Sequence, residues 1–186
     1  MDSPTESTLR RTLFETRTVL LFGEIGAELA MQVTAQLLAL DATSDAPIRL
    51  WIHSPGGHVE SADTLFDTLR FLRAPVAVLG TGWVASAGAL VYCAVPRERR
   101  FALPNTRFLL HEPRGGVGGP ASDIEVETRQ MLVMRARLHT IFAEATGRSV
   151  AQIADDTRRD HWLDAEAARD YGLVGRVIRH ADEAEV

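Results

Sequence analysis

Ser86 is the residue of this sequence whose surroundings best suit nucleophilic chemistry. It lies in "GWVASAGALVY" (82–92), where small neighbours leave room for another group beside its hydroxyl. A serine between a strand and a helix can expose its Oγ at the edge of a sheet, and the free N–H groups of a helix N-terminus stabilise developing negative charge. The alternative is that Ser86 is an ordinary helix N-cap.

The "SPGG" turn (54–57) is a second candidate element. It also follows a predicted strand and precedes a predicted helix, and its glycines allow backbone N–H groups to approach a ligand closely. One of the two turns would then supply a nucleophile and the other an oxyanion-binding N–H. The alternative is a tight strand-to-helix turn without a functional role.

A serine nucleophile needs a base, and the chain offers six histidines. His111 ends the predicted strand "RFLL" and begins an irregular segment, as a residue of a catalytic loop would. His139, on a long predicted helix, and His180, near the C-terminus, are expected at the surface. His53 and His58 flank the glycine turn without metal-ligand spacing, which favours a structural or substrate-lining role. The pattern therefore favours His111 as the base.

The orienting acid is not determined by spacing alone, because Asp155, Asp156, Asp160 and Asp164 all remain candidates. Other serine-enzyme classes match less well. Val84 stands where the α/β-hydrolase motif G-x-S-x-G requires its first glycine. The chain contains no lysine, which excludes a Ser–Lys dyad, and it has no P-loop or dinucleotide-binding fingerprint.

Composition limits the possible partners and compartments. The chain has 186 residues and a formal net charge of −5, so a nucleic-acid partner has little electrostatic support. The single cysteine, Cys93, excludes an intramolecular disulfide and a cysteine-rich zinc site, and we expect it to be a buried thiol. No signal peptide and no apolar run of about 18 residues is present, which predicts a cytoplasmic protein without membrane contact.

Strand and helix patterns alternate along the chain. Apolar periodicity and turn residues predict strands at 18–22, 48–52 and 76–80, two short extended pieces around Pro104-Asn105, and a final strand after Gly172. Helices are predicted from Ile25 to about Leu40, from Val59 to before Pro75, and from a capping box at Ser122 and Glu125 to a stop at Gly147. This alternation predicts an α/β fold around parallel strands, formed by residues 1–186 as a single domain.

Several blocks resemble the proteolytic subunit of the Clp protease family (ClpP). They are "IHSPGGHV", "WVASAGALV", "RRFALPNTRFLLHEPRGGVGG", "ASDIEVET" and "ADDTRRDHWLDAEAARDYGLVGRVI", in the family's order over roughly residues 8–180. The resemblance implies Ser86 as nucleophile, His111 as general base and Asp160 as orienting acid. It also implies that Gly57 and Ala87 supply the oxyanion-hole N–H groups.

The same resemblance implies a fold and an assembly. We expect a ClpP/crotonase-type superhelix of strand–helix units, with residues 112–146 as a protruding handle of one strand and one helix, and with residues 1–12 flexible. The family stacks two seven-membered rings around a chamber, which implies a homo-oligomeric, ATP-dependent-type serine endopeptidase that cleaves unfolded polypeptides without a cofactor or metal. Arg159 would couple ring contacts to the active site.

Two departures from the family pattern concern its partner, an AAA+ unfoldase. Only about a dozen polar residues precede "LFETRTVLLF", where the family carries an axial hairpin that touches the unfoldase. Trp51, Phe71 and Phe101 match apolar positions of the family's docking pocket, but Arg49 replaces an aromatic residue there. We therefore expect docking to be weakened or altered.

Two other functions compete with the peptidase. One is a non-catalytic ring subunit that assembles with an active paralogue. The other is a crotonase-type acyl-CoA enzyme, because the folds are related and paired glycine turns would hold a thioester oxyanion.

Close to the predicted base, Glu112 replaces a glutamine of the family, and we expect its carboxylate to raise the pKa of the His111 imidazole.

Overall fold

The computed structural model describes residues 4–116 and 118–184. Its strands are β1 (Thr18–Phe22), β2 (Ile48–Ser54), β3 (Val76–Ala85), β4 (Arg100–Ala102), β5 (Arg107–Leu110), β6 (His161–Asp164) and β7 (Arg176–Val177). Its α-helices are α1 (Pro4–Glu15), α2 (Ala27–Thr43), α3 (Val59–Phe71), α4 (Ala87–Tyr92), α5 (Ala121–Thr146), α6 (Val150–Asp156) and α7 (Ala165–Tyr171). Two 3₁₀ turns, η1 (Arg97–Arg99) and η2 (Ala181–Glu183), complete the set.

The long strand β3 is the centre of a seven-stranded sheet with the order β1-β2-β3-β4-β7. One edge of β3 pairs with β2, while its other edge pairs first with β4 (Val78 to Gly80) and then with β5 (Trp83 to Ala85). All these pairings are parallel, and β5 then pairs antiparallel with β6. The expected α/β fold around parallel strands is therefore confirmed.

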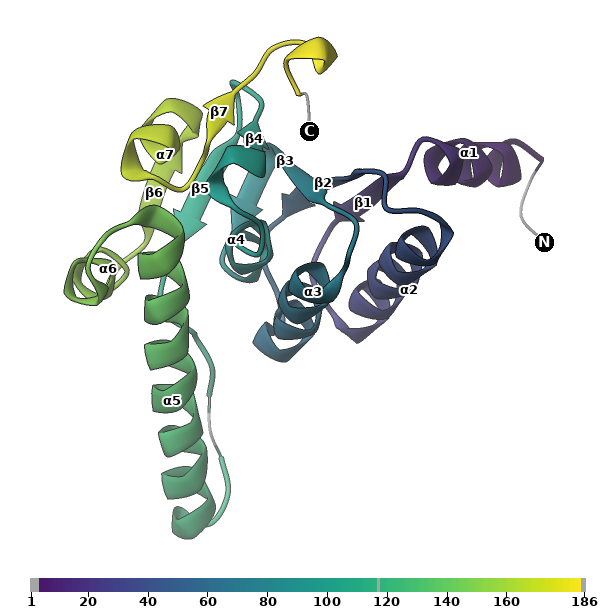
Figure 1. Ribbon diagram of the computed structural model, residues 1–186. Coiled ribbons are helices and arrows are strands. Elements are labelled where there is room, and N and C mark those ends of the chain that lie inside the picture. Colours follow the sequence, from purple (N-terminus) through teal and green to yellow (C-terminus); the bar gives the residue numbers. More distant parts are fainter. Residues whose placement is uncertain (1–3, 117, 185–186) are drawn as a thin grey trace.

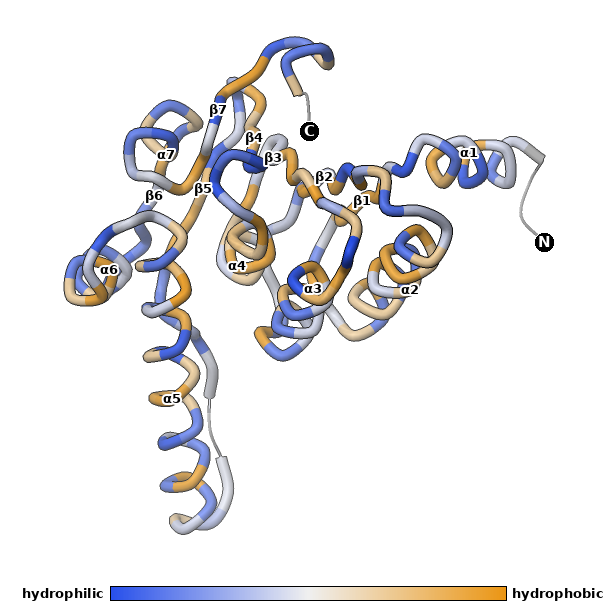
Figure 2. The backbone as a smooth tube through the Cα atoms, in the orientation of Figure 1, coloured by the Kyte–Doolittle hydropathy of each residue, from blue (hydrophilic) through white to orange (hydrophobic). Residues whose placement is uncertain are grey.

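Helices α2, α3 and α4 cover one face of the sheet (Figure 1). Strand β2 alternates between buried and more exposed residues, which shows that the opposite face is more open. Large apolar side chains remain exposed on the strands, among them Leu20, Phe22, Trp83 and Trp162. Helix α4 is buried along its whole length and is coloured mostly as hydrophobic in Figure 2. The expected buried thiol of Cys93 lies at its C-terminal end and is confirmed.

Helix α5 projects away from the rest of the molecule, and the segment leading into it runs alongside (Figure 1). A Cβ at Gly115 would lie 3.5 Å from the Met131 side chain, which places the two close together. The helix ends at Gly147 in the left-handed conformation, as predicted. The predicted capping box is wrong, because Pro120 is the N-cap and Ser122 instead hydrogen-bonds to Asp123. The expected handle strand is also absent from residues 112–116 and 118–120.

Two helices lie where the sequence indicated none. Within the N-terminal segment that we expected to be flexible, residues 4–15 form the largely exposed helix α1. Helix α6 is short and begins at Ser149, whose side chain accepts a hydrogen bond from the Gln152 N–H. No helix within residues 4–116 and 118–184 has both the length and the apolar character to cross a bilayer.

The buried side chain of Arg100 joins three parts of the fold. Only 4% of it is exposed, and its guanidinium donates hydrogen bonds to the carbonyls of Val95, Ala145 and Leu173 at 2.8, 2.9 and 3.2 Å. These carbonyls follow α4, end α5 and follow α7. A buried charge is tolerated only when such polar partners satisfy it. Arg100 therefore holds the base of the projecting helix against the sheet.

We predict that Arg100→Met lowers the free energy of unfolding by about 3 kcal/mol. Hydrogen bonds to charged groups contribute about 1.5–3 kcal/mol each, and water replaces only part of the three that are lost. Urea unfolding followed by circular dichroism measures the difference. The control is Arg97→Met, because Arg97 is exposed and its hydrogen bonds to Arg169 and Val174 lie near the surface. Equal losses in the two variants would contradict the role of burial.

Candidate active site

The sheet brings Ser86, His111 and Asp160 to one edge through backbone pairing alone. Ser86 follows β3, and its N–H donates to the Leu109 carbonyl of β5 at 2.8 Å. In the antiparallel pair of β5 and β6, Leu110 stands opposite His161, so the next position places His111 across from Asp160. Three residues far apart in the chain thus adjoin the ends of three neighbouring strands at one edge of the sheet.

The backbone of Ser86 has a conformation rare for any residue other than glycine, with φ 54° and ψ −120°. Such a conformation costs about 1–3 kcal/mol and persists only where the surrounding structure enforces it. The Ser86 side chain does not cap α4 and forms no hydrogen bond within the described part of the chain. Ser86 therefore occupies the N-cap position of α4 without the side-chain hydrogen bond that an ordinary N-cap serine makes. A sharp strand-to-helix turn of this kind exposes a serine Oγ for reaction.

The glycine turn lies directly against Ser86. A Cβ at Gly56 would be 2.7 Å from the Ser86 Cβ and 3.2 Å from its Oγ, so only glycine leaves room there. Gly57, with φ 147°, is held by Ile25, which donates to Gly56 and accepts from His58. Ser54 accepts from the Gly56 N–H at 3.1 Å and closes the turn.

Two backbone donors near Ser86 have no acceptor. Among residues 4–116 and 118–184, neither the Gly57 N–H nor the Ala87 N–H donates a hydrogen bond. Ala87 is the first residue of α4, where helical N–H groups lack intrahelical partners. Both donors flank the serine and are free to bind an oxygen atom that carries negative charge.

Three of the four candidate aspartates have structural partners. Asp155 pairs with Arg158, Asp156 accepts from the Tyr171 hydroxyl at 2.6 Å, and Asp164 caps α7 through the Ala167 N–H. Asp160 alone stands opposite His111 in the β5–β6 register. Asp160 is therefore the candidate aspartate nearest to His111 in the strand register.

The side chains of His111 and Asp160 currently make other contacts. The Nδ1 atom of His111 lies 2.6 Å from the Glu112 carbonyl oxygen, and the Asp160 carboxylate accepts from the Arg114 guanidinium. In the described residues no hydrogen bond links Ser86 to His111 or His111 to Asp160. The backbone is arranged for a triad, while the side chains are uncoupled.

The carboxylate of Glu112 turns toward α5. It lies 3.6 Å from Arg135 and 3.9 Å from the Nε2 atom of His139. His139 is buried rather than at the surface, contrary to expectation, and its ring nitrogen also contacts the Thr157 hydroxyl at 3.3 Å. Desolvation lowers the pKa of His139 below its usual 6.5, while Glu112 acts in the opposite direction. Glu112, the residue that follows His111, thus contacts the projecting helix α5.

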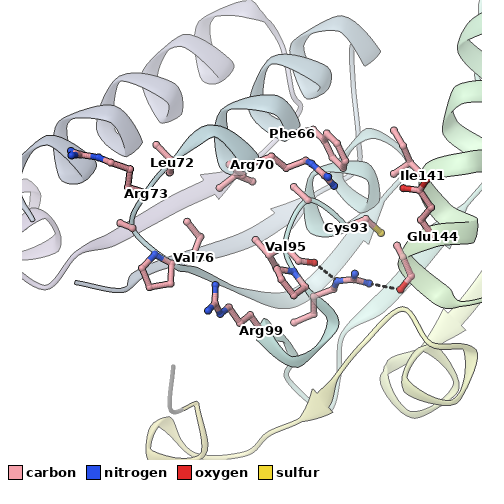
Figure 3. A pocket seen from close by; sticks show the side chains of 17 residues that line it. Phe66, Arg70, Leu72, Arg73, Val76, Cys93, Val95, Arg99, Ile141 and Glu144 are labelled. Atoms are coloured by element: carbon pink, nitrogen blue, oxygen red, sulfur yellow. Dashed lines mark hydrogen bonds between the residues drawn. The ribbon is translucent and has the colours of Figure 1, made fainter. Parts of the chain in front are cut away.

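One well-defined cavity lies away from Ser86. About 570 Å³ in volume, it is bounded by α3, by the segment after α4 and by α5, with Arg70, Cys93 and Glu144 in its wall (Figure 3). Neither Ser86, His111 nor Asp160 lines it. Burial raises the pKa of the Cys93 thiol to about 11, which keeps it protonated and unreactive. No cluster of three potential metal ligands occurs in the described residues.

The residues expected to dock a partner do not all meet. Trp51 and Phe101 line one apolar pocket of about 250 Å³, together with Arg49 and residues that precede and form η2. Phe71 lies outside this pocket, 79% exposed at the end of α3. Arg159 is exposed beside Asp160 and has no ion-pair partner within residues 4–116 and 118–184.

Known proteins match nearly the whole chain. The family described as "Clp protease" matches residues 2–181. The ATP-dependent Clp protease proteolytic subunit 3 of Rhizobium etli is 56% identical over 166 residues, which cover 89% of this chain and 86% of that protein. Subunit 2 of Gluconobacter oxydans is 54% identical over 179 residues, covering 95% and 80%. The structure of ClpP1 from Listeria monocytogenes has a TM-score of 0.87 at 46% identity and covers 95% and 99%.

A serine at a strained strand-to-helix turn of a parallel sheet is an arrangement that serine hydrolases use to expose their nucleophile. The matches extend over both the sheet and the projecting helix. The chain belongs to the Clp protease family, and it is a serine peptidase with the predicted ClpP-type fold.

We predict that Gly56→Ala lowers peptidase activity by about 10²-fold. The added methyl group must displace Ser86, and a displacement near 1 Å costs about that factor in a positioned reaction. Initial rates at saturating peptide measure the loss. Gly26→Ala is the matched control, because a Cβ at Gly26 meets no atom within 4 Å. Full activity in Gly56→Ala would contradict the close packing of the turn on Ser86.

The lowered pKa of His139 predicts a loss of stability in acid. Between its usual pKa of 6.5 and its lower value in the folded protein, the unfolded chain binds more protons, so acidification favours unfolding. The free energy of unfolding should therefore fall as the pH drops below 6.5, and His139→Gln should flatten this slope. Urea unfolding between about pH 7.5 and 5.5 measures it. The exposed His180, changed to Gln, is the control, and an unchanged slope in His139→Gln would refute the prediction.

Proposed function

We propose that Ser86, His111 and Asp160 form the catalytic triad of this peptidase and that its substrates are unfolded polypeptides. The observation that supports the assignment most strongly is the backbone register, which places the three residues at the ends of β3, β5 and β6. Asp160 is also the only candidate aspartate at that edge.

The reaction is acyl transfer. Ser86 Oγ attacks the carbonyl carbon of the scissile peptide bond while His111 accepts the hydroxyl proton. His111 then gives this proton to the leaving amine as the C–N bond breaks and the acyl-enzyme forms. Water attacks the ester with His111 again as base, which releases the carboxylic acid and restores Ser86. Asp160 orients the imidazole and stabilises its protonated form.

Gly57 and Ala87 are proposed to bind the tetrahedral oxyanion. Their N–H groups lack acceptors within the described residues and flank Ser86, so a negatively charged oxygen would satisfy both. Donors already in place stabilise charge without reorganisation during the reaction, and losing one typically costs about 10²–10³ in rate.

Assembly with further copies of the chain is the second part of the proposal. Helix α5 leaves Ile124, Val126, Leu132 and Val133 39–64% exposed on a helix that projects from the sheet. Exposed apolar surface of this kind marks interaction sites. Two stacked seven-membered rings of one chain type, joined through this helix, would bury these residues. Arg159, exposed beside Asp160, would then couple the contact between rings to the active site.

An AAA+ unfoldase is the proposed partner for large substrates. The relatives reported above are named ATP-dependent subunits, and the pocket of Trp51 and Phe101 suits an apolar side chain of a docking segment. Phe71, outside this pocket, would contribute only through a neighbouring copy. Arg49 gives the pocket wall a charge, so docking is expected to be altered. A cytoplasmic location and a single domain over residues 1–186 stay predictions from the sequence.

A non-catalytic ring subunit is the alternative function. The observation in its favour is the absence of the His111–Asp160 hydrogen bond in the described residues, since a resting triad makes this contact. Under this alternative, the chain would complete a ring formed with an active paralogue. Purified protein without other chains distinguishes the two functions.

We predict that Ser86→Ala abolishes hydrolysis of fluorogenic peptides, with a loss of at least about 10⁴-fold. The nucleophile is removed, whereas size-exclusion chromatography should show an unchanged assembly. Wild-type and variant proteins are compared at matched oligomeric size. Turnover in the wild type alone supports the triad, while intact rings without activity in either protein would favour the non-catalytic subunit.

A further inference from the structure

Arg114 contacts a proposed catalytic residue although it has no place in the reaction itself. Its guanidinium pairs with the Asp160 carboxylate, and within the described residues this is its only ion-pair partner. Arg114 lies three positions after His111, in the segment leading to α5. Glu112, the acidic side chain closest in sequence, is directed to Arg135 and His139 instead.

The pairing opposes the proposed reaction. Asp160 assists His111 by accepting its N–H and by stabilising the positive charge that the imidazole gains. A guanidinium on the same carboxylate offsets the negative charge and repels the charged imidazole. While Arg114 holds Asp160, this carboxylate is not free to accept the His111 N–H.

The contact can be exchanged at low cost. The side chains of Arg114 and Asp160 are 66% and 43% exposed, and exposed ion pairs contribute only about 0–1 kcal/mol. Between residues 113 and 119, no backbone hydrogen bond forms among the residues that the structure describes. The segment includes Gly115 and Gly116, whose missing side chains ease its movement. Another carboxylate therefore competes effectively for Arg114.

We propose that Arg114 determines specificity by exchanging Asp160 for a carboxylate of the bound polypeptide. This inference rests on the proposed function. A substrate with an acidic side chain near the scissile bond draws the guanidinium away, and Asp160 becomes free to accept the His111 N–H. Binding of such a substrate and completion of the triad are then one event. The enzyme favours polypeptides with glutamate or aspartate at one position close to the cleaved bond.

Paired fluorogenic peptides test this proposal. Each pair differs only by Glu or Gln at one position, scanned over three residues on either side of the scissile bond. In the wild type, kcat/KM at one position should be about 5- to 10-fold higher with Glu. In Arg114→Gln this ratio should fall to about 1, while turnover of the Gln peptide rises about 2- to 5-fold, the size expected when an exposed pair is removed. Arg114→Glu should prefer Lys to Glu.

Controls separate this role from a structural one. Arg158→Gln removes another exposed arginine, paired with Asp155, and should keep the wild-type ratio. Equal loss of activity toward both peptides in Arg114→Gln would mean that Arg114 supports Asp160, which overturns the proposal. A ratio of 1 at every position in the wild type overturns it as well.

A binding measurement makes the test independent of turnover. Fluorescence anisotropy of labelled Glu and Gln peptides is recorded with Ser86→Ala, with and without Arg114→Gln. Tighter binding of the Glu peptide that requires Arg114 supports the exchange even if the wild type cleaves nothing, in which case only the proposed function fails. Equal binding of both peptides overturns the exchange.

Discussion

The position of β3 between β2 and the in-line pair of β4 and β5 is the constraint on which the site depends. Only a strand long enough to pair with both β4 and β5 can end beside β5, and this places Ser86 next to the Leu109 carbonyl. The antiparallel pairing of β5 with β6 then fixes Asp160 opposite His111. The relative positions of the proposed triad residues therefore follow from strand register and do not depend on side-chain rotamers.

Side-chain arrangement is separable from this backbone arrangement. The strained turn at Ser86 and the free N–H groups of Gly57 and Ala87 are formed in the isolated chain. The contacts of His111 and Asp160 belong instead to the segment that leads to α5, which has few backbone hydrogen bonds. A fixed backbone around Ser86 thus stands beside side chains of His111 and Asp160 that do not contact each other in the described residues.

The sequence predicted the parallel α/β fold because apolar periodicity and glycine stops reflect local physics. It made Ser86 and His111 candidates by their places after strands, whereas the choice of Asp160 required the family resemblance, since only register distinguishes it from Asp164 and its other neighbours. The burial of His139 was missed because α5 is amphipathic only at its base, where it meets the sheet. The ion pair of Arg114 joins positions distant in the chain, and no local pattern reveals such a contact.

The burial of Cys93 has a practical consequence. The only thiol of the chain is inside the fold, and its raised pKa keeps it unreactive toward electrophiles that label thiolates. A cysteine introduced at the surface would therefore accept a dye at one position without removal of the native residue. Placed at Gly116, which has open space around it, such a dye would report movement of the segment beside the active site in real time.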